Sequence, residues 1–319
     1  MTAMSETPIT GLLDRNGPDR CEAMSPAQAR AWCLQLTRNR YENFPVLTSL
    51  VPAAAREDFA AIYAFCRWAD DLGDEAGDSA RALELLGWWR RELQACFAGE
   101  PRHPVFVALQ PTIRAHDLPM EPFDRLIQAF EWDNRKTRWA TMEELRASCA
   151  LSADPVGRLV LMTLGETRTE ESLRQSDAIC TALQLINHWQ DVRRDLLERD
   201  RIYIPQERSE HIPDFEARLR ITATQGWAPD REFLQAYRDM IGVLCDETEA
   251  LFDAGDPLLH ALSPAARPVV GLFAAGGRAV LAKVRAWNYE TCIRRPRLGA
   301  MQKATLVARA WWQARGVRA

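Results

Sequence analysis

The chain has 319 residues, of which 47% are hydrophobic and 26% are charged, and its formal net charge at pH 7 is −4. This composition predicts a folded protein with a sizeable core, and the lack of a long basic run argues against nucleic acid as a partner. The eight cysteines are scattered singly, the first 20 residues lack the apolar stretch of a signal peptide, and no segment reaches about 18 uninterrupted apolar residues. We therefore expect a protein of the reducing cytoplasm without a membrane-spanning helix.

Helical periodicity dominates the chain, and no stretch shows the alternation of a half-buried strand. Residues 1–24 show no period and predict a disordered N-terminal tail, whereas 25–319 are predicted to form one all-α domain. Pro257 and Pro264 bracket a predicted loop. The predicted helices cover approximately 25–38, 52–77, 78–98, 104–116, 119–134, 142–151, 170–198, 229–253, 264–288 and 299–314.

The helix predicted over 52–77 carries an acidic pair beside an apolar wall. Asp70 and Asp74 are four residues apart, and Arg67 lies one turn earlier on the same side of the helix. The residues before them are apolar or aromatic and include Tyr63 and Phe65. This helix is predicted to present carboxylates at one end of a hydrophobic surface.

The helix predicted over 170–198 carries a second polar stripe. Asn187, Asp191 and Asp195 recur every four residues, so their side chains fall within an arc of about 80°, and Gln184 joins that face. Carboxylate and amide oxygens are hard ligands that suit Mg²⁺. Taken alone, the stripe is explained equally well as a solvated face whose aspartates pair with nearby arginines.

Two acidic ladders, each beside an apolar wall, favour a shared purpose over two solvated faces. If the two helices face each other, the carboxylates form a cation site at the mouth of an apolar cavity. Such a site suits a molecule with a diphosphate head and a long hydrocarbon tail.

The sequences DDLGDE at 70–75 and NHWQDVRRD at 187–195, followed by RIYIP at 201–205, resemble the squalene/phytoene synthase family. Its members are trans-isoprenoid diphosphate synthases that join prenyl chains head to head. The resemblance runs from about Tyr41 to about Arg297, and it implies a single-domain isoprenoid synthase bundle around a central cavity. It also implies Mg²⁺ ions held by the polar residues of both ladders: Asp70, Asp74, Asn187, Asp191 and Asp195.

The resemblance implies further roles around the substrate. Arg67, Arg201 and Arg294 would contact the diphosphate, and an arginine can bind phosphate in a bidentate manner. The other implied substrate contacts are Tyr203, Gln184 and Phe44. Candidate cavity walls that guide a carbocation are Phe44, Tyr63, Phe65 and Leu161, and Asp133 is a candidate for the polar mouth.

The segment around Asn43 favours one subgroup of the family. The condensing enzymes tend to read H-x-x-S-F here, whereas this chain has Arg40 and Asn43 at the His and Ser positions, followed by Phe44. The N-F-P-V form resembles the subgroup that converts presqualene diphosphate to hydroxysqualene in hopanoid biosynthesis, although Asn43 could also simply cap a turn.

Two positions depart from the family pattern, because relatives usually have Tyr where this chain has Ser148 and Gly277. The glycine would either widen the cavity or remove a phosphate contact. Asn43 or Ser148 is the candidate to position the water that yields hydroxysqualene. No G-x-G-x-x-G sequence follows a strand, so we expect no nicotinamide domain.

Other functions stay open on the same residues. The chain could condense two prenyl diphosphates to presqualene diphosphate, squalene or phytoene. It could also be a non-catalytic assembly or binding relative, or a helical scaffold without a small-molecule site. For the favoured reaction, the expected partners are an enzyme that hands over presqualene diphosphate and the inner face of a membrane, which the protein would contact peripherally.

Overall fold

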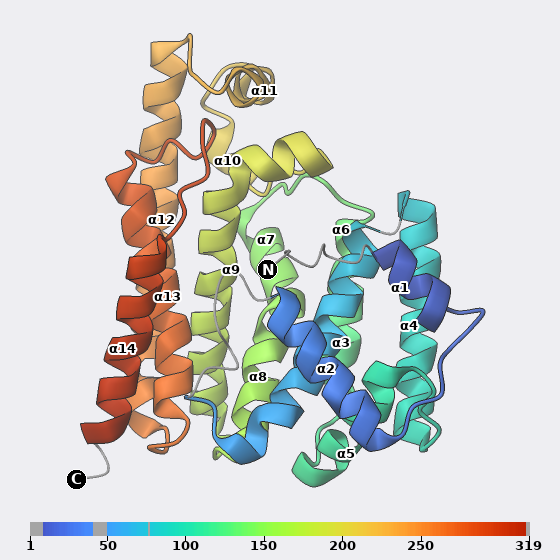
Figure 1. Ribbon diagram of the computed structural model, residues 1–319. Helices are drawn as coiled ribbons and strands as arrows, with labels where there is room; N and C mark the ends of the chain where they lie inside the picture. The colour runs from blue at the N-terminus through green and yellow to red at the C-terminus, as the bar shows by residue number, and fades with distance from the viewer. Residues whose placement is uncertain (1–8, 41–49, 76, 317–319) are drawn as a thin grey trace. The chain divides into compact units, whose positions relative to one another are not determined.

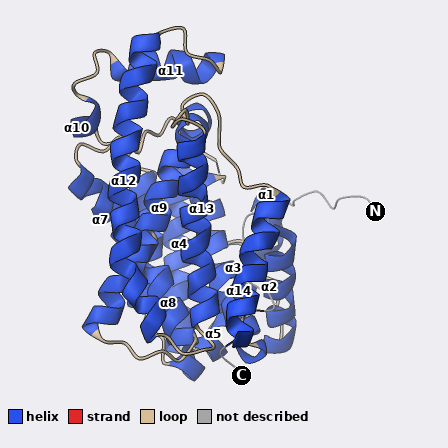
Figure 2. Ribbon diagram, turned by 90° about the vertical axis from the view of Figure 1, so that its left-hand side faces the viewer, coloured by secondary structure: helices blue, strands red, loops and turns tan. Residues whose placement is uncertain are grey.

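The computed structural model describes residues 9–40, 50–75 and 77–316, and every regular element within these ranges is a helix (Figures 1 and 2). The predicted all-α fold is confirmed, and the described residues contain no strand beyond two isolated bridges. None of the helices in these ranges combines the length and the apolarity needed to cross a bilayer. The chain forms two compact units, one of Met1–Arg135 with Pro155–Arg168 and one of Lys136–Asp154 with Thr169–Ala319.

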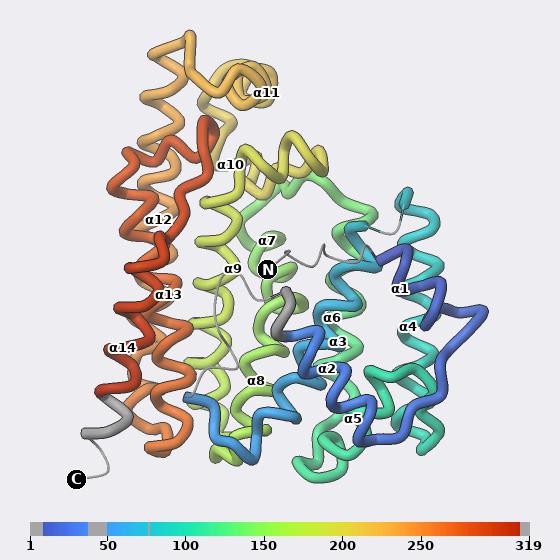
Figure 3. Tube along the Cα trace, viewed as in Figure 1, coloured from blue at the N-terminus to red at the C-terminus, as the bar shows by residue number. Residues whose placement is uncertain are grey.

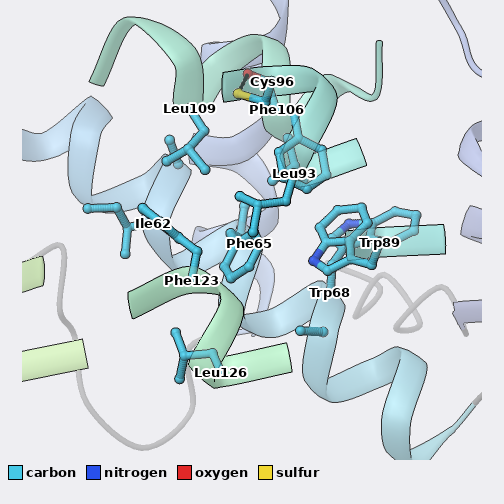
Figure 4. Close-up of a cluster of buried hydrophobic side chains, with 14 of the residues drawn as sticks. Ile62, Phe65, Trp68, Trp89, Leu93, Cys96, Phe106, Leu109, Phe123 and Leu126 are labelled. Atoms are coloured by element: carbon cyan, nitrogen blue, oxygen red, sulfur yellow. Dashed lines mark hydrogen bonds between the residues drawn. The ribbon is translucent and has the colours of Figure 1, made fainter. Parts of the chain in front are cut away.

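The first unit is built around an aromatic core. Trp68 and Trp89 are stacked with ring centroids 5.4 Å apart, and Phe65 meets Phe123 edge to face at 5.0 Å (Figure 4). All four side chains are completely buried. The helices that supply this unit are α1 (Ile9–Asn16), α2 (Pro26–Arg40), α3 (Arg56–Asp74), α4 (Ser79–Ala98), α5 (Pro104–His116), α6 (Glu121–Asp133) and most of α8 (Asp154–Thr163), with the short 3₁₀ helix Ala53–Ala55.

Two sequence predictions about this unit are corrected by the structure. Residues 9–16 form helix α1 instead of disordered tail, because Ile9 is buried in the core and Asn16 Oδ1 accepts a hydrogen bond from the Glu22 N–H at 3.1 Å. Phe65, expected in a cavity wall, packs in the centre of the aromatic core (Figure 4). Aromatic packing on all sides therefore leaves Phe65 no free face for a substrate.

The second unit is organised by the long helices α9 (Glu170–Arg199) and α12 (Arg231–Ala261), which lie side by side (Figure 3). A Cβ atom on Gly255 would lie 2.9 Å from the Gln175 carbonyl oxygen, so glycine permits this close approach. The Trp189 Nε1–H donates to Thr248 Oγ1 across the pair at 2.9 Å. The remaining helices are α7 (Met142–Ser152), α10 (Gln206–Ser209), α11 (Phe215–Gln225), α13 (Arg267–Ala286) and α14 (Ala300–Gly316).

Helix α12 passes through Pro257, so the predicted loop between Pro257 and Pro264 is shorter than expected. A proline removes one hydrogen bond from a helix. The neighbouring Gly255 and Leu258 are buried, and this packing holds the last turns of α12 in place. The helix therefore continues past Pro257 and ends at Ala261.

Candidate functional site

The first acidic ladder lies at the C-terminal end of α3, in the first unit. Arg67 Nη1 is 3.2 Å from Asp70 Oδ2, and Arg67 Nη2 contacts Asp71 and lies 3.5 Å from Glu75 Oε1. Asp71 is buried, whereas the Asp70 side chain is 40% exposed. Asp74 is half-buried one turn further along. The predicted i, i+4 arrangement of Asp70 and Asp74 on a helix is confirmed, with Arg67 beside it.

The second acidic ladder lies in the C-terminal half of α9, in the second unit. Asp191 and Asp195 are buried, being 4% and 5% exposed, whereas Asn187 is exposed and Gln184 is half-buried. Arg194 Nη2 lies 2.8 Å from both Asp191 Oδ2 and Asp195 Oδ1. The aspartates therefore form a buried anionic pair bridged by a cation from the same helix.

Arg295 completes this pair from a distant part of the sequence. Arg295 Nη2 donates to Asp191 Oδ2 at 3.0 Å, and Arg295 Nε donates to Asp191 Oδ1. The Gln190 amide donates to the Pro296 carbonyl oxygen and fastens the same segment to α9. The segment between α13 and α14 turns at Asn288 and Tyr289, which have positive φ angles of 54° and 60°.

The diphosphate contact predicted from the sequence is Arg294, the neighbour of Arg295. The Arg294 side chain is 55% exposed, and its guanidinium lies 4.3 Å from the centroid of the Trp287 ring. Its role as a diphosphate ligand stays a prediction. No helical period covers the irregular segment around Arg295, so spacing offered no signal for its partnership with Asp191.

The R-x-Y-x-P segment that follows α9 folds back onto it. Asp200 takes a left-handed conformation with φ 51°, and the Arg201 N–H donates to the Asp195 carbonyl oxygen at 3.0 Å. Tyr203 is sandwiched between Trp139 at 4.4 Å and His188 at 3.7 Å, measured between ring centroids. Arg201 and Tyr203 are both buried, so the segment is a packed element of the second unit.

Burial shifts the pKa of Asp195 and of His188 in this part of α9. Burial raises the pKa of Asp195 above its usual range, and the charge and hydrogen bond of Arg194 oppose that rise. Burial, together with the charges of Arg194 and Arg201, lowers the pKa of His188 to about 3. His188 is therefore neutral near pH 7, and its ring stacks against Tyr203.

The oxygen donors of the two ladders fit Mg²⁺ in kind, because Mg²⁺ prefers carboxylate and amide oxygens. Within the described ranges, no group of three or more His, Cys, Asp and Glu side chains is arranged to hold a metal ion. In this structure the carboxylates of Asp191 and Asp195 form ion pairs with Arg194 and Arg295. The metal assignment of the five ladder residues therefore stays a prediction.

The two positions that depart from the family pattern, Gly277 and Ser148, are both closely packed. A Cβ atom on Gly277 would lie 2.5 Å from Phe252 Cζ and 2.6 Å from Leu183 Cδ2, so neighbouring side chains occupy the space beside this glycine. This observation argues against a cavity widened at Gly277. Ser148 is buried in α7, and its carbonyl oxygen accepts from Ser152 Oγ at 3.1 Å.

The remaining predicted residues are placed as follows. Asn43 and Phe44 lie outside the described residues. Tyr63 is half-buried on α3, and Leu161 is buried on α8. Asp133 is the last residue of α6 and is half-buried.

Comparison with known proteins places these features in context. The family model described as squalene/phytoene synthase matches residues 37–302. A 15-cis-phytoene synthase of Synechocystis sp. is 29% identical over 95% of this chain and 90% of its own length. A hydroxysqualene synthase of Zymomonas mobilis is 36% identical, but over 54% of this chain and 57% of its own length.

Two solved structures resemble the chain along most of its length. Squalene synthase HpnC from Alicyclobacillus acidocaldarius is 41% identical with a TM-score of 0.72, and the match covers 90% of this chain and 99% of that one. A dehydrosqualene synthase in complex with ligand has a TM-score of 0.77 over 91% of this chain and 98% of its own, at 21% identity. The second likeness shows the fold alone.

Proposed function

The chain belongs to the squalene/phytoene synthase family, whose members act on prenyl diphosphates, and on that premise we propose that it converts presqualene diphosphate to hydroxysqualene. The observation that carries an ionising reaction is the buried Asp191–Asp195 pair with Arg194 and Arg295 around it. Burying carboxylates and guanidiniums together costs free energy of folding. Buried ionisable groups of this kind are found preferentially at functional sites.

The choice of subgroup has its own support. The Asn43-Phe44 sequence resembles the hydroxysqualene-forming enzymes, and curated hydroxysqualene synthases match about half of this chain at 34–36% identity. The 41% identity to squalene synthase HpnC extends over 90% of the chain. Together these similarities favour an enzyme that acts on a C30 substrate in squalene or hopanoid biosynthesis.

The proposed ligands of Mg²⁺ are Asp70 and Asp74 of α3 and Asn187, Asp191 and Asp195 of α9. When bound, Mg²⁺ would neutralise the leaving diphosphate, so that its C–O bond breaks without acid catalysis. On the protein side, Arg67, Arg201 and Arg294 would add positive charge around the diphosphate oxygens, as charge-assisted donors do.

The rest of the reaction concerns a cation and one water. Breaking the C–O bond leaves diphosphate and a cyclopropylcarbinyl cation, whose ring opens as the skeleton rearranges. The oxygen of one water then bonds to the cation, and the proton it loses passes to solvent. Phe44 and Tyr63 are proposed to line the path of the cation, with Asn43 positioning the water. No reductant is consumed, in keeping with the absence of a nucleotide-binding sequence.

A second candidate is the head-to-head condensation of two prenyl diphosphates. The observation in its favour is the match to the Synechocystis phytoene synthase, which extends over 95% of this chain. A non-catalytic relative is less well supported, because all five proposed metal ligands are present in the sequence.

The test is incubation of the purified chain with Mg²⁺ and presqualene diphosphate, and separately with farnesyl diphosphate, without NADPH. We expect mass spectrometry to find hydroxysqualene from the first substrate and no product from the second. Presqualene diphosphate, or another C30 condensation product, from farnesyl diphosphate would overturn the reaction in favour of condensation. If the folded protein turned over neither substrate, the proposed reaction would be overturned in favour of condensation of geranylgeranyl diphosphate or of a binding role.

The apolar substrate has a consequence for location. A diphosphate with a C30 hydrocarbon skeleton partitions into a bilayer. We propose that the protein is cytoplasmic, contacts the inner face of a membrane peripherally, and receives presqualene diphosphate from the enzyme that makes it.

A further inference from the structure

The last part of the chain is strongly basic. From residue 291 to residue 319 the sequence contains seven Lys or Arg residues and no Asp or Glu, although the whole chain has a net charge of −4. Among its described cations, Arg294, Arg297 and Arg309 are exposed. The segment therefore presents a local positive surface on a protein that is acidic elsewhere.

Helix α14, within this segment, has two opposite faces. It packs alongside α13 (Figures 1 and 2). The face turned towards α13 consists of the positions that are buried or half-buried: Lys303, Leu306, Val307 and Ala310. The exposed side carries an apolar stripe within about 100° on a helical wheel, flanked on one side by the exposed polar residues Gln302, Thr305 and Arg309; the stripe consists of Met301, Ala304, Ala308, Trp311 and Trp312.

The outward apolar face is unusual in its exposure. Met301 is 85% exposed, Trp312 80% and Trp311 42%. The solvent side of a packed helix is ordinarily polar. From Met301 to Trp312 the stripe contains no charged residue, and Arg315 follows on it one turn later; Arg309 lies about 60° to one side and Arg297 precedes the helix.

We propose that α14 binds the surface of an anionic phospholipid bilayer. The helix lies in the plane of the headgroups, with Trp311, Trp312 and Met301 inserted at the acyl boundary. Arg297 and Arg309 lie over the lipid phosphates. Tryptophan prefers the membrane interface, and basic helices with an apolar stripe bind it in this orientation. This inference rests on the proposed function in one respect: it identifies the surface through which the protein would make the membrane contact proposed above.

Charge complementarity favours a lipid surface over a protein partner. The excess of one sign is uninterrupted over the segment, and a bilayer of anionic lipids offers a matching continuous negative surface. Acidic side chains of α12 do not cancel this charge, because α13 engages them: Arg278 pairs with Asp253 and Asp256, and Arg285 pairs with Asp246.

The test is flotation of the full chain with vesicles, without substrate. We expect binding to phosphatidylcholine vesicles that contain phosphatidylglycerol, no binding to phosphatidylcholine alone, and release at high ionic strength. The double substitution Arg297→Gln/Arg309→Gln should weaken binding about 25-fold, since each cation near the surface contributes about fivefold. Trp312→Ala alone and Trp311→Ala/Trp312→Ala should weaken it at every ionic strength at which the wild-type protein binds.

Trp227 provides the matched control, because it is 58% exposed and lies in the loop between α11 and α12. Trp227→Ala should leave flotation unchanged. The proposal would be overturned by wild-type protein that stays off anionic vesicles, by equal loss of binding in Trp227→Ala, or by an α14-dependent dimer that does not float. Turnover of detergent-dispersed presqualene diphosphate, measured on the same variants, reports on the proposed reaction separately.

Discussion

Arg295 reaches across 104 positions of sequence to hold both carboxylate oxygens of Asp191, with Nη2 and Oδ2 3.0 Å apart. Asp191 also forms an ion pair with Arg194, and its side chain is 6% exposed. A carboxylate buried to this degree needs paired donors, because an unpaired buried charge is expensive. The Arg295–Asp191 pair thus fastens the irregular segment between α13 and α14 to the C-terminal half of α9.

The first prediction concerns the stability that this pair provides. Arg295→Gln should lower the free energy of unfolding by about 2 kcal/mol, because Asp191 loses a bidentate partner while Arg295 itself is partly solvated. The matched control is Arg294→Gln, which removes an adjacent guanidinium from an exposed site and should change stability little. Urea unfolding of the three proteins measures the difference. Equal midpoints for both variants would show that the pair contributes nothing to stability.

The second prediction concerns the acidic ladders. Asp191→Asn and, separately, Asp74→Asn should each lower diphosphate release by at least about 100-fold, because each removes a charge that the proposed leaving-group site needs. The chain should stay folded, as checked by circular dichroism. The control is Asp253→Asn, whose carboxylate is 65% exposed on α12. Wild-type turnover by either ladder variant would remove the metal assignment of that ladder.

The ladders also show how far sequence periodicity reaches. Asp70 with Asp74, and Asp191 with Asp195, could be placed on helices because a spacing of four is local and helical geometry fixes it. Tertiary contacts were harder to foresee. The pairing of Arg295 with Asp191 depends on how an irregular segment returns to α9, and the burial of Phe65 depends on aromatic partners from other helices. Neither relationship leaves a period in the sequence.

The third prediction uses two glycines of α13. Gly277→Ala should destabilise the protein by about 1–3 kcal/mol, because its Cβ atom would lie 2.5 Å from Phe252 and 2.6 Å from Leu183. Gly271→Ala, on the same helix, meets no atom within 4 Å and should stabilise it by roughly 0.5–1 kcal/mol through helix propensity. Thermal unfolding compares the two. A stable Gly277→Ala variant would indicate spare room beside this glycine.

The fourth prediction begins from His103, which is completely buried at the start of α5 among tryptophans. Its ring centroid lies 4.4 Å from that of Trp68 and 4.9 Å from that of Trp89. His103 Nδ1 accepts from the Val105 N–H at 3.2 Å, which requires this nitrogen to be unprotonated. Burial lowers the pKa of His103 to about 3, so the folded protein keeps the ring neutral.

Because the unfolded chain binds a proton to His103 near pH 6.5 and the folded chain does so only near pH 3, this residue favours unfolding increasingly as the pH falls through that window. Between about pH 7.5 and pH 5 it should cost roughly 2 kcal/mol of stability. His103→Asn keeps a capping acceptor for α5 but cannot titrate, so its free energy of unfolding should fall less over this range, whatever its packing loss. His260→Asn, at an exposed position, should retain the wild-type slope. The measurement is urea unfolding at both pH values. An equal fall in the free energy of unfolding for wild type and His103→Asn would contradict a neutral, buried imidazole.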